Sequence, residues 1–114
     1  METRKYNIGI IAGNFDVIHP GYIEMFREMK RHCYWVHVLL HTDPSIERPE
    51  KLKPILSVQD RVKMLLSLKD INEVSTYETE KDLVQLILKI NPGVRFLGDD
   101  YKDKHFTGKE LPID

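Results

Sequence analysis

Short apolar runs of strand length alternate with amphipathic stretches of helical period along this sequence. The runs occupy residues 6–12, 34–41, 73–77 and 94–97. Apolar side chains at helical spacing follow the first three runs, over residues 20–30, 58–66 and 83–90,. Strands that alternate with helices form right-handed parallel βαβ units, which place helices on both faces of one sheet. The pattern therefore predicts an α/β fold, a Rossmann-like three-layer sandwich with a parallel sheet of four to five strands.

Capping residues mark where the predicted helices begin. Pro20 suits the first position of a helix, because its missing N–H would have no partner there,. Ser57 and Thr79 precede the second and third helices as N-caps, and each is followed three residues later by an aspartate,. The polar, proline-containing residues 43–56 predict a long loop, and loops of that length are usually functional or mobile.

Length and composition bound the class of protein. With 114 residues, the chain predicts a single domain over residues 1–114,. The 17 basic and 18 acidic side chains leave a net charge of −1, which gives no indication of a nucleic-acid or membrane-surface partner,. One cysteine, Cys33, excludes an intrachain disulfide, and no secretion signal is visible, so we expect a cytoplasmic protein,. The apolar runs are too short to span a membrane.

Polar clusters follow three of the predicted strands, at residues 13–19, 41–43 and 98–100. Ligands of doubly wound sheets bind at the carboxyl ends of the strands, so we expect these clusters to meet at one edge. A helix that begins after the first cluster would direct its unpaired N–H groups and positive dipole end toward this edge. Gly13 and Gly21 would let a phosphate approach the backbone closely. The sequence therefore predicts an anion site there.

His19 and Tyr22 are three residues apart, so both would project from one side of the first helical turn and together could hold a phosphate chain,. The dinucleotide and P-loop patterns, G-x-G-x-x-G and G-x-x-x-x-G-K-[ST], are absent,. A plainer interpretation stays open. A glycine turn follows a strand in any doubly wound fold, and His19 would then be only a helix cap.

Four motifs in order resemble those of one group of enzymes. They are GNFDVIHPGY at residues 13–22, HTDP at residues 41–44, the spacing of Lys53, Ser57 and Arg61, and GDDY at residues 98–101. These motifs are similar to G-[TS]-F-D-x-x-H-x-G-H, S-T-D, K-x(3)-S-x(3)-R and G-D-D-W of the nucleotidyltransferase superfamily, in its cytidylyltransferase branch. Within that branch the chain resembles the short bacterial glycerol-3-phosphate cytidylyltransferases.

The resemblance implies that the phosphate of a small phosphorylated alcohol attacks the α-phosphorus of CTP and releases pyrophosphate without a covalent enzyme intermediate. Glycerol 3-phosphate is the first expected acceptor, and Mg²⁺ would bridge phosphate oxygens with few protein ligands. A phosphate monoester has a second pKa of about 6, so it is already an anion and no strong general base is required. Catalysis would then consist of positioning and charge stabilisation. The family also implies a homodimer.

The resemblance also assigns roles to residues. His19 would hydrogen-bond the phosphates, with Tyr22 beside it. Lys53 and Arg61 would neutralise phosphate charge from the loop and the second helix. Asp16 would either orient His19 or hold a metal-bound water. The expected nucleotide contacts come from the two glycine-containing segments: Gly13, Asn14, Phe15, Asp16, His19, Gly21, Gly98, Asp99 and Asp100.

The chain departs from the family pattern at several positions. Tyr22 stands at the family's second histidine, and a phenol with a pKa of about 10 donates a hydrogen bond but supplies no positive charge. Asn14 replaces a Thr or Ser, and Asn72 stands where the bacterial enzymes carry an aspartate. The family's R-T-x-G-I-S-[TS] segment has no counterpart up to Asp114. Two interpretations stay open: the sequence is a fragment of a longer chain, or the domain lacks the C-terminal phosphate-binding segment.

Two other functions stay open. The same fold hosts adenylyltransferases that use ATP, and no motif here decides the base. Tyr22 and the missing segment would also fit a nucleotide-binding module with little or no catalysis. At single positions, Arg61 would alternatively be an exposed charge on an amphipathic helix, and Asp99 and Asp100 would be turn residues.

Overall fold

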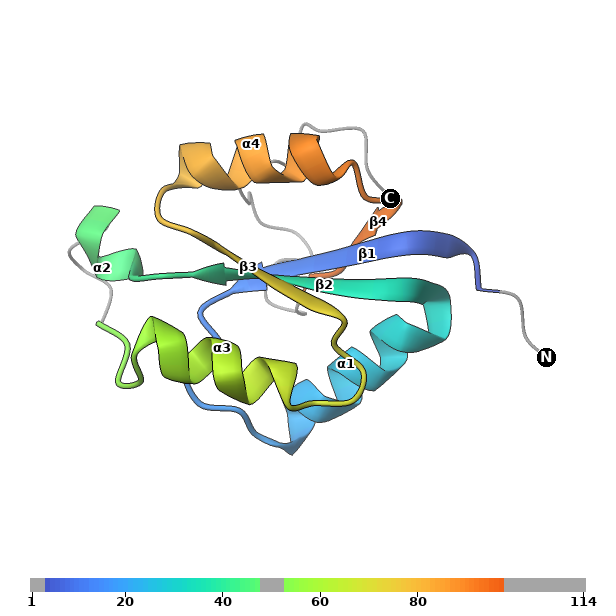
Figure 1. Ribbon diagram of the computed structural model, residues 1–114, viewed down its shortest axis with the longest axis horizontal. Coiled ribbons are helices and arrows are strands. Elements are labelled where there is room, and N and C mark those ends of the chain that lie inside the picture. Colours follow the sequence, from blue (N-terminus) through green and yellow to red (C-terminus); the bar gives the residue numbers. More distant parts are fainter. Residues whose placement is uncertain (1–3, 48–52, 98–114) are drawn as a thin grey trace.

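Four parallel strands form one sheet in the computed structural model, which describes residues 4–47 and 53–97 (Figure 1). The strand order is β3-β2-β1-β4, and the pairings are parallel. The elements in chain order are β1 (Tyr6–Gly13), α1 (Pro20–His32), β2 (Cys33–His41), α2 (Pro44–Glu47), α3 (Val58–Leu66), β3 (Glu73–Tyr77), α4 (Glu80–Ile90) and β4 (Val94–Arg95). The predicted α/β fold with a parallel sheet is confirmed.

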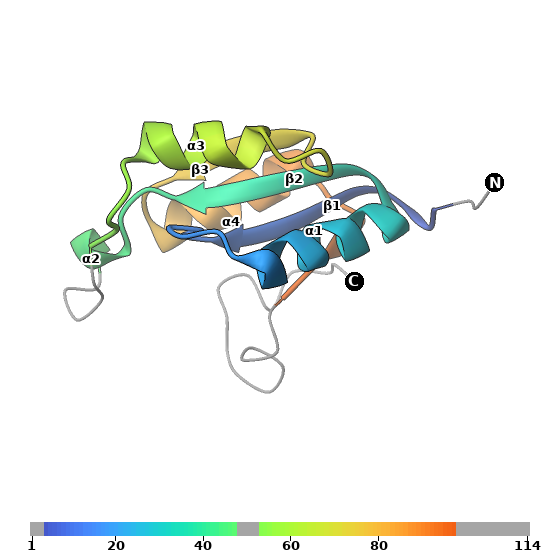
Figure 2. The same cartoon turned by 90° about the horizontal axis from the view of Figure 1, so that it is seen from below.

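The helices cover both faces of the sheet, with α1 and α3 on one face and α4 on the other (Figures 1 and 2). Gly13 at the end of β1 is in register with Leu40, and His41 at the end of β2 is in register with Tyr77 at the end of β3. The carboxyl ends of these strands therefore meet at one edge. This arrangement confirms the convergence that we predicted for the segments after β1 and β2.

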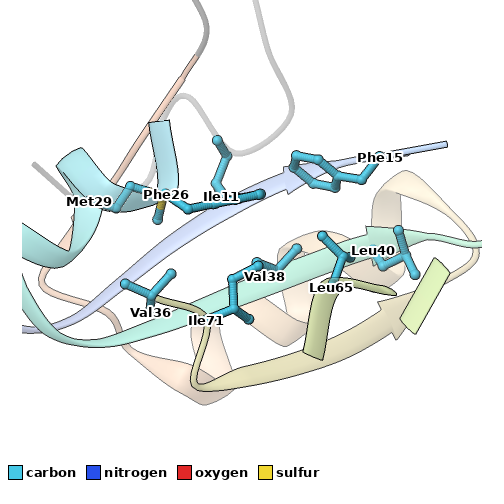
Figure 3. Packing of buried hydrophobic residues seen from close by; sticks show 9 residues of the cluster. All are labelled: Ile11, Phe15, Phe26, Met29, Val36, Val38, Leu40, Leu65 and Ile71. Carbon is cyan, nitrogen blue, oxygen red and sulfur yellow. The ribbon is translucent and has the colours of Figure 1, made fainter. Parts of the chain in front are cut away.

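Apolar side chains fill the space between the sheet and its helices. Under α4, the buried side chains are Ile10, Leu39, Tyr77, Leu83 and Ile87. On the other face, a larger cluster joins α1 and α3 to the sheet (Figure 3): Ile11, Phe15, Phe26, Met29, Val36, Val38, Leu40, Leu65 and Ile71. A fully buried side chain of this kind contributes about 1.5–3 kcal/mol, so these two layers are the main stabilising term of the fold.

The predicted helix starts are confirmed by the contacts of their caps. Helix α1 begins at Pro20. At the start of α3, the Ser57 hydroxyl accepts a hydrogen bond from the Asp60 N–H at 3.1 Å. At the start of α4, Thr79 Oγ1 accepts from the Asp82 N–H at 3.0 Å, and Asp82 Oδ2 accepts from the Thr79 N–H at 3.3 Å. The backbone N–H groups of Thr79 and Asp82, which have no partner within the helix, are thus both paired with local side chains,.

Two segments differ from the sequence prediction. The short helix α2 interrupts the loop expected over residues 43–56, because Asp43 accepts hydrogen bonds from the N–H and the hydroxyl of Ser45 and stabilises a helical turn. Strand β4 is shorter than the apolar run that predicted it, although the Phe96 N–H still donates to Ile10 O at 2.9 Å.

The buried faces of α1 and α3 also differ in detail from their predicted apolar stripes. Ile23 of α1 is 39% exposed and Leu66 of α3 is 51% exposed, although both were expected in the stripes. On α3 the buried side chains are Leu65 and Arg61. No helix in residues 4–47 and 53–97 has the length and apolar character needed to cross a membrane.

Cys33 is fully buried at the junction of α1 and β2. Its N–H donates to Met29 O, the last contact of α1. Its Sγ lies against Gly9 of β1, where an added Cβ would overlap the sulfur. Burial raises the pKa of the thiol above its ordinary value of 9.0,. Gly9 thus provides the space in which the sulfur packs.

Candidate active site

The turn from β1 to α1, with its flanking residues (13–21), contains half of the predicted site residues. It lies at the carboxyl edge of the sheet, beside the segment that follows β2. Arg61 of α3 joins the two segments, since its guanidinium donates to Asn14 O and Thr42 O. The nucleotide contacts expected from residues 98–100 lie outside the described part of the chain and stay predictions.

His19 is the N-cap of α1. Its backbone is extended, with φ −125° and ψ 169°, and its Nδ1 accepts a hydrogen bond from the Gly21 N–H at 3.0 Å. A ring nitrogen that accepts carries no proton, so this contact selects the neutral tautomer with the proton on Nε2. The side chain is exposed, which leaves Nε2–H able to donate to a ligand. The helix-cap interpretation of His19 is therefore correct, and it is compatible with a phosphate contact.

Gly21 makes this cap possible. A Cβ at this position would lie 2.7 Å from Cε1 and 3.0 Å from Nδ1 of His19. The imidazole occupies the space that a side chain would need, so glycine lets it reach the backbone N–H. The first turn of α1 contains no acidic residue, so the positive end of its dipole is not neutralised there,. The start of α1 is thus suited to an anion.

Aromatic rings support this turn. Phe15 is 5% exposed and has a left-handed backbone with φ 46°, an uncommon conformation for a bulky residue,. Its ring contacts Tyr22 edge to face at a centroid distance of 5.5 Å and Phe26 at 5.7 Å. Tyr22 in turn lies 4.4 Å from the His19 ring. A Cβ on Gly13 would come within 3.2 Å of the Phe15 ring. Close packing therefore holds the strained turn in place.

Asp16 connects the β1–α1 turn to the segment before α3. Its Oδ2 accepts a hydrogen bond from the Ile55 N–H at 2.7 Å, and its Oδ1 accepts from the Leu56 N–H at 2.8 Å. These hydrogen bonds stabilise the carboxylate and so lower the pKa of Asp16 below its ordinary value of 3.8,. The sequence pattern did not indicate this contact. The two roles expected for Asp16, at His19 or at a metal-bound water, stay predictions.

Arg61 lies buried between these segments, with 1% of its surface exposed. Its guanidinium donates to four backbone carbonyls: Asn14 O at 3.0 Å, His41 O at 2.8 Å, Thr42 O at 2.5 Å and Leu56 O at 3.1 Å. The interpretation of Arg61 as an exposed helix charge is therefore wrong. Burial lowers the pKa of the guanidinium, and the charges of Asp16 and Asp43 oppose this shift. Its direct contact with a triphosphate stays a prediction.

Lys53 is exposed, unlike Arg61. The hydroxyl of Ser45 has the largest effect on Asp43 and lowers the pKa of that carboxyl, and the positive charges of Lys53 and Arg61 lower it further. Lys53 precedes Ile55 by two residues, and the Ile55 N–H donates to Asp16 of the β1–α1 turn at 2.7 Å. Lys53 therefore adds positive charge to the same edge of the sheet as the start of α1.

Acid titration is expected to show the hydrogen bonds of Asp16 and Asp43. Because both folded-state pKa values are lowered, the stability that these groups contribute is complete above their ordinary value of 3.8,. It is lost only as the pH falls through the lower folded values. Carboxyl carbon shifts measured by NMR from neutral to acidic pH should show both groups titrating below 3.8. A higher value for Asp16 would contradict its two backbone contacts.

Two surface hollows lie apart from His19. One, of about 340 Å³, lies beside the end of β3 and α4 and includes Thr42. The other, of about 640 Å³, lies on α3 and is lined by Val58, Gln59, Val62, Lys63, Leu66 and Ser67. Neither hollow includes His19 or Lys53. Within residues 4–47 and 53–97, no three His, Cys, Asp or Glu side chains form a cluster for a metal ion.

Several bacterial proteins are similar in sequence to this chain. Bifunctional protein HldE from Hyphomonas neptunium is 32% identical over 105 residues, which cover 91% of this chain and 21% of the relative. Bifunctional protein HldE from Gluconacetobacter diazotrophicus is 28% identical over 115 residues, which cover 96% of this chain and 23% of the relative. The chain thus spans about a fifth of the length of these curated relatives.

A solved structure has the same fold. The lipopolysaccharide core biosynthesis protein from Thermoplasma volcanium matches with a TM-score of 0.74 at 24% identity, over 85% of this chain and 78% of that chain. The pattern of one family, described as cytidylyltransferase-like, matches residues 10–110, which contain the β1–α1 turn, Lys53 and Arg61. The chain belongs to the cytidylyltransferase-like family.

Proposed function

We propose that this nucleotidyltransferase domain transfers CMP from CTP to the phosphate of a small phosphorylated alcohol, with glycerol 3-phosphate as the first acceptor to test. Family membership supports the reaction class. The observation that carries the proposal is the start of α1, where the cap leaves Nε2–H of His19 as a donor beside a helix N-terminus without acidic residues,. ATP is the competing donor substrate.

The proposed reaction is a single displacement at phosphorus. A phosphate oxygen of the acceptor forms a bond to the α-phosphorus of the nucleotide, and the bond to the bridging oxygen of the β-phosphate breaks. Pyrophosphate leaves with the electron pair of that bond. Since the acceptor is already an anion at neutral pH, the protein needs no strong base and acts by positioning and by stabilising negative charge.

Different residues of the site would have different roles in this reaction. The N-terminus of α1 and the Nε2–H of His19 would stabilise charge on the phosphates, and the ammonium of Lys53 would add to it. Arg61 would hold the ends of β1 and β2 against α3 through its carbonyl contacts. Tyr22 would offer a neutral hydroxyl where the family carries a second histidine.

Mg²⁺ would enter the site on the triphosphate and neutralise part of its charge. The carboxylates near the site fit this arrangement, because Asp16 accepts two backbone N–H bonds and Asp43 accepts two bonds from Ser45. Oxygens engaged in this way retain lone pairs for metal-bound water, and Mg²⁺ usually keeps several waters.

Nucleotide binding is expected to raise the melting temperature of the domain. At 100 times its Kd a ligand stabilises the folded state by about 2.7 kcal/mol, a rise of about 10 °C for a domain of this size. We expect this shift with Mg²⁺ and CTP, a smaller shift with ATP, and none with cytidine, which has no phosphates. Pyrophosphate release should then be measured with glycerol 3-phosphate and with a panel of sugar phosphates.

The outcomes distinguish the possible functions. A shift with ATP alone would move the proposal to an adenylyltransferase. Shifts without pyrophosphate release for any acceptor would indicate a nucleotide-binding module. An equal shift with cytidine would show that the phosphates contribute nothing, which contradicts the role given to the start of α1.

A further inference from the structure

The segment before α3 is held in place by polar contacts rather than by apolar packing. Ile55 is 83% exposed, and neither Ile55 nor Leu56 belongs to the two buried clusters. The contacts that fix this segment are the two N–H bonds to Asp16 and the bond from Arg61 Nε to Leu56 O at 3.1 Å. Leu56 is thus held from both sides of its peptide backbone, and Ile55 is held by Asp16.

Pro54 links this fixed segment to Lys53. The proline ring fixes its own φ near about −65° and restricts the preceding residue to extended conformations. Pro54 therefore narrows the range of backbone conformations that Lys53 can adopt beside Ile55. As long as Asp16 holds the Ile55 N–H, the Lys53 side chain starts two residues from a backbone group that is fixed to the β1–α1 turn.

We propose that Asp16 is a positioning residue, which holds Lys53 where its ammonium meets the phosphates of the bound nucleotide. This inference rests on the proposed function, since it assigns Lys53 a phosphate partner. Both oxygens of Asp16 are used, one for each N–H, and the charge makes these hydrogen bonds stronger than those of a neutral acceptor,.

Loss of the Asp16 charge and loss of its hold on the segment before α3 have opposite effects on nucleotide affinity. Asp16→Asn removes a negative charge near a polyanion, so charge alone would tighten nucleotide binding. Asn also keeps one acceptor and loses the other, so the segment before α3 loosens and Lys53 is no longer held. If Asp16 positions Lys53, Asp16→Asn should weaken nucleotide binding. If only its charge matters, the same substitution should strengthen nucleotide binding.

A double-mutant cycle with Lys53→Met tests the proposal, with the Kd of Mg²⁺–CTP, Mg²⁺–ATP and tripolyphosphate measured by calorimetry. Lys53→Met should raise Kd about 10- to 100-fold through loss of a charged contact. Asp16→Asn should raise Kd by roughly threefold or more in the wild-type chain. In the Lys53→Met chain, Asp16→Asn should change Kd by less than about twofold. A change of that size is within the variation seen for mutations that act independently.

Two further measurements give matched controls. Asp82→Asn removes a carboxylate that also accepts a backbone N–H, at the start of α4, and it should leave every Kd unchanged. Hydrogen exchange of the Ile55 and Leu56 amides should be faster in Asp16→Asn and unchanged in Asp82→Asn. This exchange reports the loosening of the segment without any nucleotide.

The outcomes separate the positioning role of Asp16 from the proposed function. Additive effects of Asp16→Asn and Lys53→Met, or tighter binding by Asp16→Asn alone, would overturn the positioning role while the proposed function stands. If the wild-type chain binds tripolyphosphate but neither CTP nor ATP, the proposed function is overturned. The same double-mutant cycle, measured with tripolyphosphate, would still decide the role of Asp16. Failure of the wild-type chain to bind any of the three probes would overturn both.

Discussion

His19→Asn is expected to lower kcat by about 10²- to 10³-fold, the cost of removing one preorganised donor at a reacting phosphoryl group. Its folding stability should change by less than about 0.5 kcal/mol, because Asn is among the best N-cap residues and the backbone of His19 already has the extended conformation of a cap,. Steady-state pyrophosphate release and urea denaturation measure the two quantities separately.

Two neighbouring variants complete this experiment. His19→Ala should lose the same activity and also about 1 kcal/mol of stability, because the Gly21 N–H then has no cap,. Gly21→Ala should lose activity with His19 intact, since its Cβ would displace the imidazole from the first turn. Wild-type activity in His19→Asn would show that the ring serves only as a cap.

Arg61→Met is expected to destabilise the domain by about 3–5 kcal/mol, a large part of the stability of an average domain. The substitution leaves four backbone carbonyls without their donor at the meeting point of β1, β2 and α3,. Arg61→Lys keeps the charge but lacks the planar set of donors. It should therefore lower the free energy of unfolding by less than Arg61→Met does, but still by more than about 1 kcal/mol. Urea denaturation measures both.

The matched control is Arg27→Met, which removes an arginine of α1 from an exposed ion pair with Glu24 at 3.5 Å. That pair should contribute less than about 1 kcal/mol, because both side chains are solvated. If Arg61→Met were no more destabilising than Arg27→Met, the carbonyl contacts would not be structural, and a role of Arg61 only in ligand binding would be favoured.

Local signals predicted the elements of this fold well. The Ser57 and Thr79 caps were predicted because a cap depends on side chains within three residues of each other in the sequence,. The order of parallel βαβ units followed from the alternation of strand and helix patterns, and this order placed the turns after β1 and β2 at one edge,.

Burial of Arg61 could not be predicted in the same way. A charged residue between apolar helix positions is usually exposed, and the burial depends on carbonyls contributed by the ends of two strands and by Leu56. Motif spacing singled out Arg61 but not its partners. The same limit applies to Asp16, whose partners lie about 40 residues further along the chain.

The backbone of Phe15 was also beyond local prediction. Its left-handed conformation would be more usual for the neighbouring Asn14, since asparagine tolerates that region better than a bulky residue does,. Contacts of the Phe15 ring with Tyr22 and Phe26 compensate for the strain, and these contacts form only when α1 packs on the sheet. The short helix α2 was missed because a loop-like composition concealed the Asp43–Ser45 turn.

The reactivity of the buried Cys33 thiol can report how often the folded domain opens locally. Since the chain has a single cysteine and the folded structure covers it fully, a thiol reagent modifies only molecules in which the sulfur has moved away from β1 and become accessible,. An alkylated sulfur is too large for the space beside Gly9, so the modified chain cannot close again. Alkylation of this domain therefore acts as an irreversible trap, and its rate under native conditions counts the open molecules.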